Sequence, residues 1–155
     1  MPYERLNKIR ILDAKFSAEK VLIIADVAPA YEPEVEVTKF IRRFEFTAPN
    51  DFLITDTVET AAPKIITSYL HADNSIEKNA DGSFLFESPK PNLLVKILSP
   101  LAVETRVEKN ILTAPGRPGS VDKGMREERG VRLAISSKEK VKQAKLQMEL
   151  TIQNK

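Results

Sequence analysis

Short apolar runs separated by prolines and glycines are the feature that most limits how this chain can fold. Ten prolines and five glycines occur among the 155 residues. The runs between them are rich in Val, Ile, Leu, Phe and Thr, which are typical of strands when they occur in short, bounded segments. The sequence therefore predicts an all-β fold, an antiparallel two-layer β-sandwich of the supersandwich type, with about ten to twelve short strands.

The apolar runs also place the expected strands and turns. Gly82, in Ala80-Asp81-Gly82-Ser83, is expected to take a positive φ in a hairpin turn. Residues 114–128 have no apolar period and predict a long loop, and residues 137–144 are compatible with one helical turn. The strands are expected at 8–12, 20–26, 36–47, 51–58, 64–71, 84–87, 92–99, 103–107, 110–113, 129–136 and 145–153.

Size and charge exclude several classes of protein. The length is that of one domain, spanning 1–155. Lys and Arg are spread along the chain and the net charge is only +2, so no nucleic-acid partner is expected. No apolar run reaches the ~20 residues of a membrane helix, and the N-terminus lacks the apolar core of a signal peptide. The absence of cysteine excludes disulfides and thiol catalysis.

The clearest local prediction is a hairpin whose two arms each carry one charge on an apolar face. At period two, Arg42 lies among three phenylalanines of the first arm, and Asp56 lies among the apolar residues of the second. Pairing Phe46 with Phe52 across the turn puts Arg42 opposite Asp56. We therefore predict a partly buried Arg42–Asp56 ion pair. The alternative interpretation is that Arg42 faces an anionic sugar.

Two other polar residues end apolar strands and are candidate metal ligands. Asp26 follows the apolar run 21–25, and His71, the single histidine of the chain, follows the run 65–70. If these strand ends adjoin, they offer one oxygen and one nitrogen ligand. Zinc needs at least three protein ligands, so the site would be incomplete. No Gly-x-Ser-x-Gly nucleophile elbow is present, and no catalytic residue is predicted.

Four segments of the chain carry a resemblance to a known family. They are Ala25-Asp-Val-Ala-Pro-Ala-Tyr, Phe40-Ile-Arg-Arg-Phe-Glu-Phe, Asp51-Phe-Leu-Ile-Thr-Asp and Tyr69-Leu-His. Together they resemble the β-rich C-terminal domain of heparinase II/III-like polysaccharide lyases. Their order and spacing, in a similarity that spans roughly residues 20–137, are similar to those of the family's Gly-Asp-Ala, Arg-Arg, aromatic-Val-Val-x-Asp and Leu-His strands, with Ala25 in place of the usual Gly.

This resemblance implies specific roles. The family cleaves acidic polysaccharides by β-elimination, with most catalytic residues on an (α/α) toroid that this chain lacks, so the chain alone is expected to be inactive. Asp26 and His71 match two of the family's three zinc ligands, and the upstream His has no counterpart. Tyr31 matches the motif's Tyr and is expected to bind substrate; a core or turn role is the alternative.

The resemblance further implies an acidic polysaccharide and a toroid domain as partners, a homodimer through the face that should meet the toroid, and a periplasmic or extracellular location. Two other functions stay open. A stand-alone carbohydrate-binding sandwich needs an exposed aromatic platform, for which the chain offers three Tyr and no Trp. A purely structural domain would bury and satisfy both Asp26 and His71.

Overall fold

The part of the chain that the structure describes folds into eleven antiparallel strands with three short 3-10 helices, which confirms the predicted all-β sandwich. The computed structural model describes all residues except 1–2, 101, 115–127 and 155. None of the helices in this described part is long and apolar enough to cross a bilayer. The helices are η1 (Tyr3–Lys8), η2 (Ala28–Ala30) and η3 (Pro33–Val35), and the strands are β1 (Arg10–Phe16), β2 (Lys20–Asp26), β3 (Val37–Thr47), β4 (Asp51–Lys64), β5 (Thr67–Ala72), β6 (Ile76–Lys78), β7 (Phe84–Phe86), β8 (Asn92–Ile97), β9 (Val103–Ala114), β10 (Glu128–Ser137) and β11 (Val141–Gln153).

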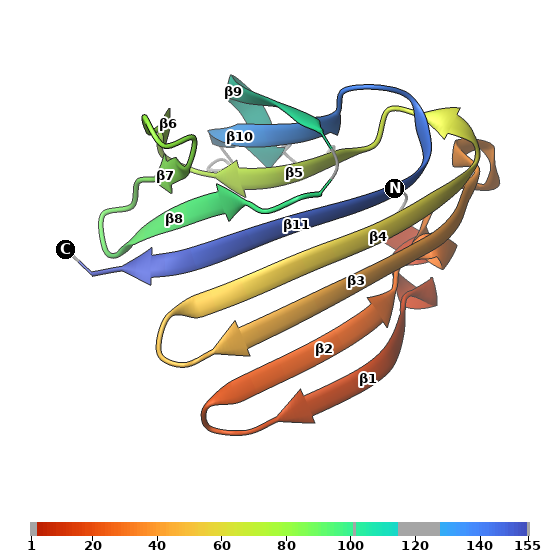
Figure 1. The fold of residues 1–155 in the computed structure, drawn as a ribbon, viewed down its shortest axis with the longest axis horizontal. Helices are drawn as coiled ribbons and strands as arrows, with labels where there is room; N and C mark the ends of the chain where they lie inside the picture. Colours follow the sequence, from red (N-terminus) through yellow and green to blue (C-terminus); the bar gives the residue numbers. More distant parts are fainter. Residues whose placement is uncertain (1–2, 101, 115–127, 155) are drawn as a thin grey trace, which may run out of the picture.

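The strands form two sheets of unequal size. The large sheet has eight strands in the order β1-β2-β3-β4-β11-β8-β7-β6, and the small sheet has three in the order β5-β10-β9. The small sheet lies beside β8 and β11, whereas β1 and β2 extend away from it at the other side of the large sheet (Figure 1). One end of the large sheet therefore has no second layer.

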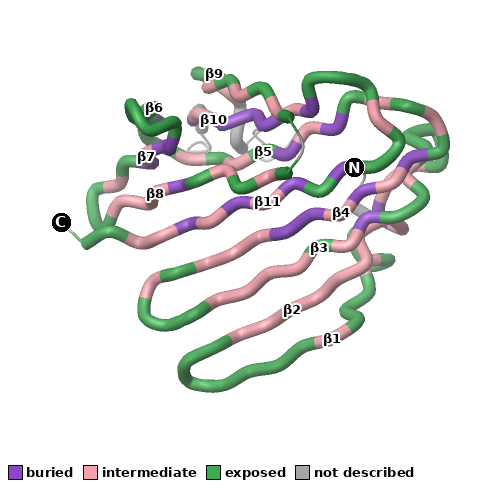
Figure 2. Tube along the Cα trace, viewed as in Figure 1, coloured by how far each residue is buried: buried purple, intermediate pink, exposed green. Residues whose placement is uncertain are grey.

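Burial follows this unequal coverage. The main core cluster joins β6, β7, β8 and β11 of the large sheet to β10, with Val95, Leu133 and Ile135 fully buried. A second cluster around Phe40 and Leu146 lies nearer the uncovered end. Figure 2 shows buried residues along β4, β10 and β11 and an almost wholly exposed β1.

The predicted hairpin is confirmed residue by residue. β3 and β4 pair with Arg42 opposite Asp56, and Phe46 opposite Phe52. Because side chains alternate across a strand, this register puts both charges on the inner, apolar face. Gly82 has the expected positive φ of +85° in the turn between β6 and β7.

Several predicted boundaries are wrong. The helical turn at 137–144 is not formed, because β11 already begins at Val141, which packs on the second core cluster. β9 is one strand rather than two: Asn110 has a φ of +59°, and a register shift against β10 absorbs the extra residues. β4 continues past Val58 to Lys64, and β6 was missed because it has three residues. The loop predicted at 114–128 falls on residues 115–127, outside the described part.

Candidate functional site

The Arg42–Asp56 pair lies at the centre of the candidate site. Arg42 donates from Nε to one carboxylate oxygen of Asp56 and from Nη2 to the other, each at 2.7 Å. The Asp56 side chain is 3% exposed and that of Arg42 is 46% exposed. The hydrogen bonds to Asp56 raise the pKa of Arg42. The predicted partly buried ion pair is therefore confirmed, with its cation at the surface and its anion beneath.

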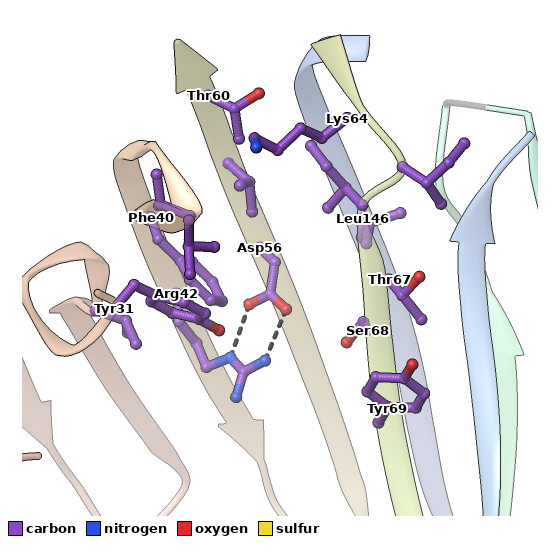
Figure 3. A pocket seen from close by; sticks show the side chains of 16 residues that line it. Tyr31, Phe40, Arg42, Asp56, Thr60, Lys64, Thr67, Ser68, Tyr69 and Leu146 are labelled. Atoms are coloured by element: carbon purple, nitrogen blue, oxygen red, sulfur yellow. Dashed lines mark hydrogen bonds and ion pairs between the residues drawn. The ribbon is translucent and has the colours of Figure 1, made fainter. Parts of the chain in front are cut away.

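A groove of about 470 Å³ opens beside this pair (Figure 3). Its floor is the inner face of β3 and β4, including Phe40 and Val58. One wall is the segment that carries η2 and η3. The other wall is the consecutive run 64–69, which leads into β5. The groove therefore lies where the small sheet stops covering the large one.

The β5 wall is the open edge of the small sheet. β5 pairs with β10 and, among the described strands, with no other. Adjacent residues of both faces, Ser68 and Tyr69, line the groove, as expected where a strand is approached from its edge. Backbone N–H and C=O groups on such an edge are available to a ligand.

Tyr31 lines the groove from the opposite wall, and its role in substrate binding stays a prediction. The centroid of the Tyr31 ring lies 5.8 Å from that of the Phe40 ring. The guanidinium carbon of Arg42 lies over the Phe40 ring, 5.5 Å from its centroid. Desolvation by burial raises the pKa of Tyr31, opposed by the nearby Arg42 charge. The phenol is therefore protonated at neutral pH and can donate a hydrogen bond.

Asp26 is hydrogen-bonded by two groups close to the end of β2. It ends β2 as predicted, and its carboxylate accepts a 2.6 Å hydrogen bond from Arg10 and one of 3.2 Å from the backbone N–H of Ala28. The side chain is 15% exposed. Both oxygens are thus engaged in fixing the exit of β2 into η2.

The structure does not bring His71 to Asp26. His71 is exposed on β5 of the small sheet, and its neighbours Leu70 and Ala72 pack on the main core cluster. Val27, next to Asp26, packs on the second cluster, and β2 and β5 end at opposite sides of the molecule (Figure 1). The condition of adjoining strand ends is therefore not met.

These residues do not fit a shared zinc ion. No group of three or more His, Cys, Asp or Glu able to hold a metal occurs among the residues that the structure describes. A zinc role for Asp26 or His71 with other ligands stays a prediction. His71 instead lies beside Tyr69, with ring centroids 6.3 Å apart. Because His71 is exposed, the complete burial of both Asp26 and His71 that a purely structural domain predicts is not observed.

Ser68 is a groove residue that the sequence analysis missed. It is buried, it alternates with the apolar Ile66 and Leu70 on the inner face, and its hydroxyl has no hydrogen-bond partner among the described residues. A serine within an apolar alternation was the available signal. By contrast, Lys64 at the rim is paired with Glu36 at 2.8 Å, which no sequence pattern indicated.

Sequence comparison and structure comparison give different outcomes. No protein-family model matches the sequence, and no curated protein matches it. Several solved structures do match the structure of this chain. One is a heparinase III, with a TM-score of 0.72 at 13% identity, and the match covers 95% of this chain and 22% of the heparinase III chain. The heparan sulfate lyase HepC from Pedobacter heparinus matches with a TM-score of 0.72 at 12% identity and the same coverage.

The chain has the fold of one part of heparinase III. A further heparinase III structure agrees, with a TM-score of 0.66 over 94% of this chain. The chain spans 22% of the length of the first heparinase III structure, so most of that enzyme has no counterpart here. At such low identity the likeness to heparinase III concerns the fold, and it agrees with the β-rich domain that the sequence resembles.

Proposed function

We propose that this chain is the β-domain of a heparinase III-like polysaccharide lyase, which binds acidic polysaccharide and is inactive in β-elimination by itself. The observation that carries the proposal is the shared fold over 95% of this chain. One matched protein is named as a heparan sulfate lyase, which supports an acidic polysaccharide as ligand and a periplasmic or extracellular location.

The chemistry of the groove supports binding rather than catalysis. β-Elimination needs a base aligned with the proton next to a uronate carboxylate, and neutralisation of that carboxylate. The described groove residues include no histidine, Asp56 is bound by Arg42, and burial keeps the Tyr31 phenol protonated. In this proposal the base comes from a toroid domain, on the same or another chain.

The uncovered end of the large sheet supports a protein partner. Phe16 and Ile11 on the edge strand β1 are 71% and 61% exposed, and their apolar face continues across β2 and β3. Exposed apolar surface of this kind is typical of interaction sites. The proposal assigns this face to the toroid domain, and to a second copy in the isolated chain.

The test uses the purified chain with heparan sulfate, and with neutral dextran as the control ligand. We expect saturable binding of heparan sulfate, no binding of dextran, and no formation of unsaturated uronate, followed by its ultraviolet absorbance. Elimination by the chain alone would overturn the proposed inactivity. Failure to bind any acidic polysaccharide would overturn the assignment of the ligand.

A stand-alone carbohydrate-binding domain is the second candidate, favoured by one observation. Tyr69 is 45% exposed, and the Arg132 guanidinium lies 4.3 Å from its ring centroid. An exposed aromatic ring on a sheet can stack on a sugar. In this case Tyr69→Ala would reduce polysaccharide binding, and no toroid partner would be needed.

A further inference from the structure

We propose that the groove between β3, β4 and β5 binds a uronate residue of the polysaccharide, with its carboxylate on the outer edge of Arg42 and its hydroxyls on Tyr31 and Ser68. This inference rests on the proposed function and adds to it the recognised group and the residues that recognise it.

The ion pair presents only its positive end to a ligand. The Asp56 side chain is 3% exposed and already accepts two hydrogen bonds, whereas the Arg42 side chain is 46% exposed. Nε and Nη2 of Arg42 bind Asp56, and Nη1 has no partner among the described residues. A carboxylate entering the groove therefore meets free guanidinium N–H groups, with which charge-assisted hydrogen bonds form.

Two neutral donors flank the guanidinium from opposite walls. In Figure 3, the hydroxyl of Tyr31 points toward Arg42 and that of Ser68 points into the groove. Neither hydroxyl is engaged by another described residue, and burial keeps the Tyr31 phenol protonated. A pyranose ring carries hydroxyls on both sides of its carboxylate, so this spread of donors suits a sugar acid better than a simple anion.

The remaining surface suits the carbon skeleton of a sugar ring. Phe40 and Val58 form an apolar floor, and the Tyr31 and Phe40 rings stand side by side. The volume of about 470 Å³ falls in the range of roughly 300–1,000 Å³ that is typical of small-ligand pockets. The open edge of β5 leaves room for the polysaccharide to continue beyond the bound residue.

The decisive experiment compares two forms of one ligand on the whole chain. An unsulfated oligosaccharide containing glucuronate, and the same oligosaccharide after reduction of its carboxyl groups, are titrated by calorimetry. We expect carboxyl reduction to weaken binding roughly tenfold or more, as loss of one charge-assisted contact implies. Tyr31→Phe and Ser68→Ala, which each remove one oxygen atom, are each expected to weaken binding about threefold to tenfold.

Matched variants separate this site from general electrostatics. Arg42→Gln/Asp56→Asn neutralises the pair on the inner face and is expected to lose the preference for the carboxylate. Arg43 and Glu45 form a similar double hydrogen bond, at 2.8 and 2.9 Å, on the opposite face of β3. Arg43→Gln/Glu45→Gln should therefore bind like the unmodified chain. Thermal unfolding of each variant checks that it is folded.

The outcomes distinguish the two proposals. If heparan sulfate binds but the carboxyl-reduced oligosaccharide binds as well as the unreduced one, the uronate site is overturned while the proposed function stands. The same conclusion follows if the Tyr31 and Ser68 variants bind like the Arg43/Glu45 control. If neither heparan sulfate nor the glucuronate oligosaccharide binds, both proposals are overturned.

Discussion

Replacing Arg42 by leucine should destabilise the fold far more than an ordinary surface substitution. In the wild type, Asp56 has a 3% exposed side chain and two hydrogen bonds of 2.7 Å from Arg42. Arg42→Leu leaves that carboxylate buried without a partner. Breaking a buried pair from one side costs roughly 3–5 kcal/mol, and Arg42→Leu should fall in this range because the stranded group is the buried one.

Replacing Asp56 should destabilise the fold less than replacing Arg42. In Asp56→Asn the remaining Arg42 is 46% exposed and can turn to water, and the asparagine still accepts one hydrogen bond. We expect a loss of about 1 kcal/mol, near that of a single net hydrogen bond. The double variant Arg42→Leu/Asp56→Leu should recover most of the loss, because apolar replacement of a whole buried pair is often neutral or stabilising.

Urea unfolding of the four proteins, followed by circular dichroism, measures these differences. The slope with urea should stay constant, so that the midpoints report stability. For a domain of this size, about 3–5 kcal/mol also lowers Tm by roughly 6–20 °C. The reasoning is refuted if Arg42→Leu costs less than about 1 kcal/mol, or if the double variant is as unstable as Arg42→Leu, because either result means that Asp56 is not stranded.

Three further predictions concern other parts of the molecule. Hydrogen bonds from Arg43 lower the pKa of Glu45 below its ordinary value of 4.5. Ionised Glu45 therefore stabilises the fold above pH 4.5, and this stabilisation is lost as the pH falls through the lower pKa of the folded state. Glu45→Gln should flatten the fall in Tm below pH 4.5. Gly82 has a φ of +85° with no atom near an added Cβ, so Gly82→Ala should cost about 1 kcal/mol from the backbone alone, and an unchanged urea midpoint would contradict this. Phe16→Lys places a charge on the exposed edge strand and should reduce self-association in sedimentation velocity; unchanged sedimentation would exclude this edge as the contact.

The sequence was most informative where alternation and pairing reinforce each other. In the β3–β4 hairpin, one turn position and a period of two predicted the pairing of Phe46 with Phe52 and of Arg42 with Asp56, because a slip of one residue would move every phenylalanine to the outer face. The same logic failed at Asn110, where a residue at positive φ lets one strand continue through a break in its pattern. Bulges of this kind leave little trace in composition.

The site was only half predictable, for a physical reason. The role of Arg42 could be proposed from the alternation of its hairpin, and that of Tyr31 from the resemblance to the family's motif. Ser68 and the open edge of β5 come from the other sheet, and nothing in the sequence indicates how two sheets overlap. Asp26 and His71 do not adjoin for the same reason, since their strands, β2 and β5, belong to different sheets.

The unequal sizes of the two sheets explain why a charged pair is tolerated on an apolar face. Between the two sheets the inner faces form the main apolar cluster, which includes Leu133 and Val95. Beyond it, on β1, apolar groups meet solvent. Arg42 and Asp56 occupy the border between these regions, where the anion can be buried and the cation can reach water. A pair in this position fixes the hairpin register and leaves a guanidinium edge free, so one arrangement supports both the fold and the proposed binding of uronate.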